Sequence, residues 1–126
     1  MPRRREPDPL AQAVGQRIRQ LRQEAGLTME KLAFESELGS KGHLSNLERG
    51  LVMPTIKTLQ VLADRLGVLL LDLVTFPEAD DRQRVVDLTR SLPKGSLRKL
   101  VRELSPQPAP GKGATQPRQQ RRRSAG

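Results

Sequence analysis

The residues best suited to chemistry lie between Thr28 and Gly50, and they offer hydrogen bonds rather than catalysis. Leu44 and Leu47 stand three residues apart, which is the spacing of one buried helical face. The positions that this face leaves outside are small or hydrogen-bonding: Lys41, Gly42, Ser45 and Asn46. Such a helix fits the DNA major groove, which is about 12 Å wide and exposes hydrogen-bonding base edges. The segment therefore predicts double-stranded DNA as the first candidate ligand.

Two short helices joined by a tight, glycine-containing turn account for this segment. Leu32 and Ala33 share one face of the first helix. Thr28 and Ser40 stand where a side-chain oxygen can cap the backbone N–H groups of a helix start. Gly50 then ends the second helix. Two helices joined in this way form a helix-turn-helix, whose second helix enters the major groove.

Nothing in the sequence points to an enzyme, a cofactor or a metal site. The chain has no cysteine, and His43, its single histidine, cannot form a zinc site alone. No phosphate-cradling glycine motif or metal-ligand spacing occurs. No stretch approaches the roughly 18 apolar residues of a membrane span, and the first residues do not resemble a signal peptide. A soluble cytoplasmic protein without membrane contact is expected.

The composition favours one small domain built from helices. A chain of 126 residues is long enough for one core with tails. Only 35% of the residues are hydrophobic, and the chain has two Phe but no Trp or Tyr. The core must therefore consist mainly of Leu, Ile, Val, Ala and Met, which suits packed helices better than a sheet. The expected fold class is all-α.

The helix-turn-helix is expected to belong to a domain of residues 10–76. The first helix should run from Leu10 to a glycine cap at Gly26, and the fourth should follow Thr55 and end at Gly67. The buried stripe expected for the first helix is Val14, Ile18, Leu21 and Ala25. Together with the two helices of the motif and a short fifth helix, these make a five-helix domain.

The short fifth helix is expected over residues 68–74, at the edge of the domain. The residues needed to face the core are Leu70, Leu73 and Val74. Leu69 and Leu71 then leave apolar surface exposed, which is a sign of an interaction site. This surface is either a contact between two copies of the chain or a seat for the helices that follow.

Residues 77–104 are expected to form a two-helix extension, between the domain and a basic tail. Because isolated helices of about ten residues are marginal, the extension must pack on the domain, on a second copy or on another protein. Residues 1–9 and 105–126 are expected to be disordered. The tail from residue 105 carries five basic residues and no acid, more than half of the net charge of +9. It either contacts phosphates without sequence preference or only solvates the chain.

These motifs, in this order, resemble the lambda-repressor-like helix-turn-helix domain of the Xre and phage-repressor family of bacterial transcriptional regulators. The matching elements are Arg22, Leu32-Ala33, the run from Leu44 to Gly50, and Pro54-Thr55. They cover about residues 10–76. The resemblance implies a five-helix all-α domain in a nucleoid-associated bacterial protein. It also implies that Arg22 forms a structural ion pair with Glu48, because a guanidinium can hold a carboxylate with two parallel hydrogen bonds.

The resemblance further implies which residues touch DNA. Lys41, Gly42, Ser45 and Asn46 match the positions that read base edges in the family. Lys41 is suited to guanine and Asn46 to adenine, while Ser45 is permissive. His43 and Arg49 are the candidates for phosphate contacts, although a solvated His43 remains an alternative.

Two features depart from the family pattern. The turn between the two helices of the motif is one residue longer than usual, which leaves the angle between them open. Met29 occupies a position where the family often has a phosphate-contacting Gln, so that contact cannot be transferred to this chain. Phosphate contacts must then come from other side chains or from backbone amides at helix starts.

The sequence favours a DNA-binding transcriptional regulator. A repressor that binds a pseudo-palindromic operator as a homodimer fits a small module without an evident effector domain. One alternative is the antitoxin of a toxin–antitoxin pair, which would bind its toxin through residues 77–104 and its own promoter through the domain. Another is a protein-interaction adaptor that uses the helical domain as a scaffold.

Overall fold

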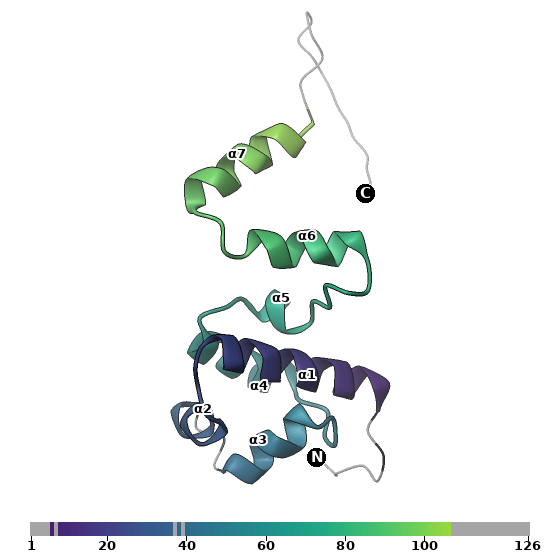
Figure 1. Ribbon diagram of the computed structural model, residues 1–126, viewed down its shortest axis with the longest axis vertical. Coiled ribbons are helices and arrows are strands. Elements are labelled where there is room, and N and C mark those ends of the chain that lie inside the picture. Colours follow the sequence, from purple (N-terminus) through teal and green to yellow (C-terminus); the bar gives the residue numbers. More distant parts are fainter. Residues whose placement is uncertain (1–5, 7, 37, 39, 107–126) are drawn as a thin grey trace, which may run out of the picture. The chain divides into compact units, whose positions relative to one another are not determined.

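The computed structural model describes residues 6, 8–36, 38 and 40–106, and all regular elements among them are helices (Figure 1). They are α1 (Pro9–Glu24), α2 (Met29–Glu35), α3 (Lys41–Glu48), α4 (Ile56–Leu66), α5 (Leu70–Leu73), α6 (Asp81–Thr89) and α7 (Lys94–Leu104). The predicted all-α class is confirmed for this part of the chain. Most of the predicted arm and nearly all of the basic tail lie outside the described residues. No described helix is long and apolar enough to cross a membrane.

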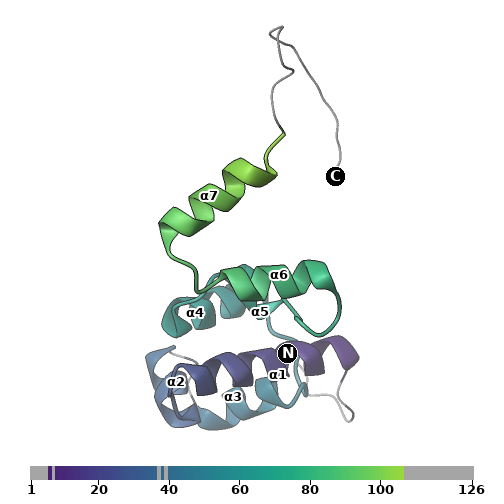
Figure 2. The same cartoon turned by 45° about the horizontal axis from the view of Figure 1, so that its top comes forward.

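The chain divides into two compact units, one that ends at Ser91 and one that begins at Leu92. The first unit contains α1 to α6, and the second contains α7. Within the first unit, α1 lies between α3 on one side and α5 and α6 on the other (Figure 1 and Figure 2). α6, which the sequence places in the extension, thus belongs to the same compact unit as the helix-turn-helix.

Side-chain caps fix where the first four helices begin. Asp8 Oδ2 accepts hydrogen bonds of 3.1 Å from the backbone N–H groups of Leu10 and Ala11, so α1 starts at Pro9. The hydroxyls of three further residues cap their helices in the same way, and these are Thr28, Ser40 and Thr55. Because each cap satisfies a backbone donor that has no partner within its helix, these residues set the register of the helix-turn-helix.

α1 and α3 approach so closely that their backbones touch. A Cβ atom placed on Gly15 of α1 would lie 2.3 Å from the carbonyl oxygen of Leu47. Gly50, just after α3, has φ +76°, and a Cβ there would lie 2.6 Å from Cα of Gln12. The core beside this crossing is aliphatic, and its most deeply buried side chains include Ile18, Leu32, Leu44, Leu47 and Leu62. The recognition helix candidate is thus seated directly on α1.

The fifth helix differs from the prediction. α5 is a single turn over Leu70–Leu73 rather than a helix over 68–74, and Asp72 Oδ2 accepts a 2.9 Å hydrogen bond from the backbone of Leu69. Leu73 is buried, but Val74 follows the end of the turn and is 44% exposed. The expectation that Val74 faces the core was therefore wrong, because the helix stops before its side chain can turn inward. Leu69 and Leu71 are exposed, as predicted.

Candidate nucleic-acid interface

α3 separates its residues into a buried face and an open face. Leu44, Leu47 and Glu48 are buried against the rest of the domain. The predicted base-contacting residues of this helix are exposed or half-exposed, and these are Lys41, Gly42, Ser45 and Asn46. The open face offers an ammonium, a hydroxyl and an amide, which together can donate to and accept from base edges. α3 therefore has the chemistry of a major-groove helix.

Arg22 and Glu48 form a buried, two-pronged ion pair between α1 and α3. Arg22 Nε lies 2.7 Å from Glu48 Oε2, and Nη2 lies 3.2 Å from Oε1. Nη1 of the same guanidinium donates to the carbonyl of Leu27 at 2.8 Å. Parallel hydrogen bonds of this kind fix an orientation as well as a distance. The pair therefore holds the direction of α3 relative to α1.

Lys41, at the start of α3, is held by a carboxylate from α2. Its Nζ lies 3.1 Å from Glu30 Oε2, and the two side chains are 53% and 66% exposed. The carboxyl of Glu30 interacts with its own backbone N–H and accepts the hydrogen bond from Lys41, and both lower its pKa below the ordinary value. From the sequence, Glu30 could be placed only in the first turn of its helix. Its pairing with Lys41 could not be predicted, because the two residues are 11 positions apart and lie on different helices.

The candidate phosphate contacts lie at both ends of α3. His43 is exposed in the first turn, where its backbone N–H donates to Ser40 Oγ at 3.1 Å. Arg49 caps the last turn and is also exposed. Among the described residues, neither side chain forms an ion pair within 4 Å. Both are therefore available to an external anion.

The two departures from the family pattern are Met29 and the longer turn between α2 and α3. Met29 is half-buried and packs against the hydrophobic core, so its position in α2 serves packing. Leu38, within the turn, also packs against the core. The turn residues 37 and 39 lie outside the described residues, and so does the geometry of the longer turn at those points.

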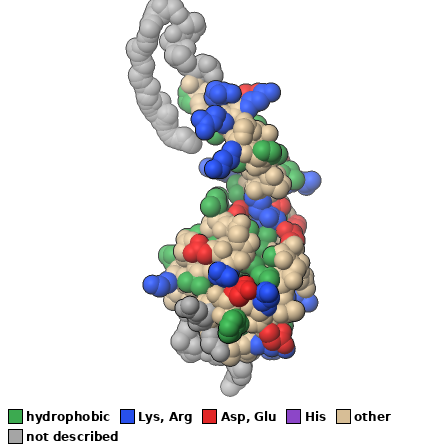
Figure 3. All heavy atoms as spheres, turned by 90° about the vertical axis from the view of Figure 1, so that its left-hand side faces the viewer, with side chains coloured by type: hydrophobic (Ala, Val, Ile, Leu, Met, Phe, Trp, Pro, Cys, Tyr) green, Lys and Arg blue, Asp and Glu red, His purple; other side chains and the backbone are tan. Residues whose placement is uncertain are grey.

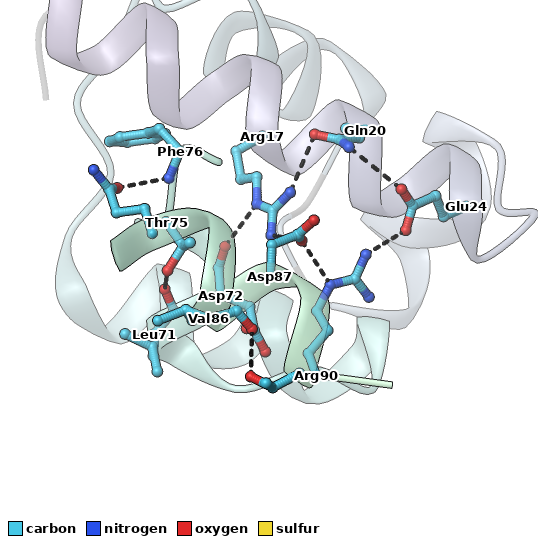
Figure 4. Close-up of polar contacts among 12 residues, drawn as sticks. Arg17, Gln20, Glu24, Leu71, Asp72, Thr75, Phe76, Val86, Asp87 and Arg90 are labelled. Atoms are coloured by element: carbon cyan, nitrogen blue, oxygen red, sulfur yellow. Dashed lines mark hydrogen bonds and ion pairs between the residues drawn. The ribbon is translucent and has the colours of Figure 1, made fainter. Parts of the chain in front are cut away.

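A second polar cluster, which the sequence did not reveal, joins α1 to α5 and α6 (Figure 4). Arg17 is 3% exposed and uses all three guanidinium nitrogens. Nε donates to the carbonyl of Asp72 at 2.8 Å, Nη1 to Gln20 Oε1 at 3.2 Å, and Nη2 to Asp87 Oδ1 at 2.7 Å. One feature of the sequence could have indicated the buried role of Arg17. Residue 17 lies on the buried face of α1, between Val14 and Ile18.

Arg90 completes this cluster from the end of α6. Its Nε lies 3.1 Å from Asp87 Oδ1, and its Nη2 lies 2.6 Å from Glu24 Oε1 of α1. The hydrogen bond from Arg17 is the largest influence that holds the pKa of Asp87 below its ordinary value, and Arg90 acts in the same direction. We refer to Arg17, Gln20, Glu24, Asp87 and Arg90 as the α1–α6 clasp.

The surface elsewhere carries mixed charge. Acidic and basic side chains are interspersed, with hydrophobic ones between them, on the face of the first unit drawn in Figure 3. No group of three or more His, Cys, Asp or Glu side chains able to hold a metal ion occurs within the described part of the chain. The open face of α3 is therefore the site whose chemistry is most specific.

Known proteins resemble the chain over the segment that contains the helix-turn-helix. The model of the Helix-turn-helix family matches residues 18–73. The chain is 47% identical over 62 residues to the uncharacterized HTH-type transcriptional regulator y4dJ of Sinorhizobium fredii, covering 49% of this chain and 79% of that protein. It is 42% identical over 59 residues to the HTH-type transcriptional regulator DdrOP3 of Deinococcus deserti, covering 47% of this chain and 45% of the relative.

The immunity repressor protein of Bacillus phage phi105 is a further relative, 40% identical over 55 residues that cover 44% of this chain and 38% of the repressor. The match thus spans less than half of DdrOP3 and of the phage repressor. Among solved structures, the clp gene regulator ClgR from Corynebacterium glutamicum gives a TM-score of 0.51 at 28% identity, over 78% of this chain and 96% of that one. The SinR protein/SinI protein complex gives 0.51 at 27%, over 71% and 92%.

Proposed function

Because the chain belongs to the helix-turn-helix family of DNA-binding transcriptional regulators, of the Xre and phage-repressor kind, we propose that it acts as a repressor on a pseudo-palindromic operator. The observation that carries the proposal is the open hydrogen-bonding face of α3, held in one orientation by the Arg22–Glu48 pair. Repression needs only occupancy of a promoter, which suits a small module. A relative named as an immunity repressor supports the same sign of regulation.

The proposed contacts divide into those that specify and those that position. Lys41 donates to guanine N7 and O6, and Asn46 makes paired hydrogen bonds with adenine, with Ser45 beside it. Gly42 contributes no side chain and lets the backbone approach the base edges. Arg49 and His43 contact phosphates on either side. The assignment is supported by the position of these residues on the open face of α3, where Lys41, Gly42, His43 and Arg49 are exposed and Ser45 and Asn46 are half-exposed.

We propose that a second copy of the chain covers apolar side chains of α5 and α6. Five such side chains, each at least 44% exposed, lie on or next to these helices: Leu69, Leu71, Val74, Val85 and Leu88. α6 packs in the same unit yet leaves Leu69, just before α5, and Leu71, within it, exposed. Because α5 and α6 lie on the opposite side of α1 from α3, pairing there leaves both recognition helices free. Two-fold pairing would set them about 34 Å apart.

Selection of binding sites from random DNA tests the function and the contacts together. The wild type should enrich a two-fold symmetric motif at moderate salt. Asn46→Ala should cost about 1 to 3 kcal/mol on that site and relax one base-pair position in each half. Arg49→Ala, the matched control, should weaken binding to all sequences alike. Recovery of no motif by the wild type would refute the regulator, and an asymmetric single site would refute the dimer.

A protein partner is the second candidate, as in the antitoxin alternative. Val85 and Leu88 stand one turn apart on α6, and Val101 and Leu104 stand three apart on α7, all of them exposed. The solved complex of SinR with SinI is a case in which a protein of similar fold binds another protein. Co-purification of a stoichiometric partner from cells would support this candidate. A homogeneous chain that dimerises alone would argue against it.

A further inference from the structure

Lys41, the charged residue among the base-reading candidates, already forms an ion pair within the protein. Lys41 Nζ donates to Glu30 Oε2 at 3.1 Å, whereas Arg49 at the other end of α3 forms no ion pair within the described residues. Exposed ion pairs contribute little to stability, because water screens the charges and the side chains lose freedom. The pair therefore matters less for folding than for what Lys41 can bind.

We propose that Glu30 is a specificity-determining residue that acts through Lys41, an inference that rests on the proposed function. An ammonium has three N–H donors, so the hydrogen bond to Glu30 leaves two for guanine N7 and O6. The bond also directs Nζ from a flexible four-carbon stem to one place at the start of α3. Lys41 thus loses less side-chain freedom when it meets a matching base edge.

On random DNA the same pair has the opposite effect. Lys41 by itself would be attracted to any phosphate, which adds affinity without preference. The carboxylate of Glu30 offsets the positive charge of Lys41 and repels the phosphate backbone of DNA. Glutamate is ionised at neutral pH, and contacts with its own N–H and with Lys41 lower the pKa of Glu30 further. The pair therefore weakens binding to random DNA more than binding to the operator, and so raises the ratio of the two.

Glu30→Gln measured against Glu35→Gln is the direct test. Glu35 lies on the same helix, but its carboxylate faces Lys31 at 3.7 Å and Arg65 at 3.4 Å instead of the recognition helix. For Glu30→Gln we expect affinity for random duplex to rise about three- to tenfold, with a salt slope steeper by about 0.9, the value for one more phosphate contact. Operator affinity should rise less or fall, so the ratio drops. Glu35→Gln should leave the ratio unchanged.

The same substitution in a Lys41→Ala background tests whether Glu30 acts through Lys41. Loss of Lys41 alone leaves an uncompensated carboxylate near the phosphates, so binding to both DNAs should fall. Adding Glu30→Gln should restore random-DNA binding while leaving the ratio unchanged. A ratio that still falls in this background would mean that Glu30 reads DNA directly, and the inference would be wrong.

Two further outcomes separate the inference from the function beneath it. If the wild type selects a motif but Glu30→Gln keeps the wild-type ratio and salt slope, the inference fails and the repressor stands. If the wild type selects no motif, the proposed function fails before any substitution is made. Equal melting temperatures for wild type and Glu30→Gln should accompany every arm, because the Glu30 side chain is 66% exposed.

Discussion

Two helices are fastened to α1 by arginines, and they are fastened in different ways. Arg22 holds α3 through a two-pronged pair with Glu48, beside a backbone contact at Gly15 and an aliphatic core. Arg17 holds α6 through Asp87, and no residue of α6 is fully buried. The first junction combines polar and apolar contacts, whereas the second depends chiefly on the α1–α6 clasp. We therefore expect α3 to keep its place on α1, and the core to stay intact, when α6 is released.

Loss of one partner at the α3 junction should have the largest effect. Glu48→Ala leaves the buried guanidinium of Arg22 without its counter-charge, which costs about 3 to 5 kcal/mol of unfolding free energy. Arg22→Ala should cost a similar amount. Chemical denaturation of both single variants and the double variant measures this. The double variant should lose less than the sum, and simple additivity would show that the two residues do not act as a pair.

A methyl group at the backbone contact should be almost as harmful. Gly15→Ala places a Cβ 2.3 Å from the Leu47 carbonyl oxygen. The nearest atoms all belong to the backbone of Leu47 and Glu48, so no flexible side chain can move aside. We expect a loss near the upper end of overpacking costs, about 3 kcal/mol. Gly42→Ala is the matched control in a helix of the same unit, because its nearest neighbour would be Ser40 Oγ at 3.8 Å. It should be neutral or slightly stabilising, and an equal loss in both variants would contradict the tight crossing.

The α6 junction should lose less, and lose it locally. Asp87→Ala removes the carboxylate that Arg17 and Arg90 share, at a cost of about 1 to 3 kcal/mol for charged hydrogen bonds. Amide hydrogen exchange should show α6 losing protection while α1 and α3 keep theirs. Asp81→Ala, on the first turn of the same helix, serves as the control. Uniform loss of protection across the unit would mean that the two junctions unfold together.

Acid should release α6 with the smallest energetic effect. The pKa of Asp87 is lower in the folded protein than in the unfolded chain, chiefly because Arg17 donates to it. Its contribution to stability is therefore complete above the unfolded value, about 3.9, and is lost as pH falls through the folded value below it. In the wild type, the protection of α6 amides relative to their intrinsic exchange rate at each pH should fall below about pH 4. Asp87→Ala should lack that step.

The sequence predicted what depends on local pattern or on family resemblance. The faces of α3 follow from Leu44 and Leu47, and the helix starts follow from Thr28 and Ser40. The Arg22–Glu48 pair came from resemblance, and the structure holds those two side chains together. Each of these rests on residues within a helix or on a motif with a fixed role.

What the sequence did not predict depends on contacts between distant segments. Arg17 and Asp87 are 70 residues apart, so a charge on the buried face of α1 has no visible partner in the pattern. The need for glycine at position 15 appears only when two helices cross at close range. Val74 was misplaced because apolar spacing cannot show that a helix ends after one turn.

The three hydrogen-bond acceptors of Arg17 have a consequence for proteolysis of α6. When α6 leaves, the guanidinium loses the counter-charge of Asp87 but keeps its hydrogen bonds to the carbonyl of Asp72 and the amide oxygen of Gln20. We expect this open form to be reached by local opening of the folded unit. Trypsin cleaves after arginine in extended chain, and α6 carries Arg82 and Arg84. The rate of cleavage at these arginines would therefore report the fraction of molecules in which the α1–α6 clasp is open.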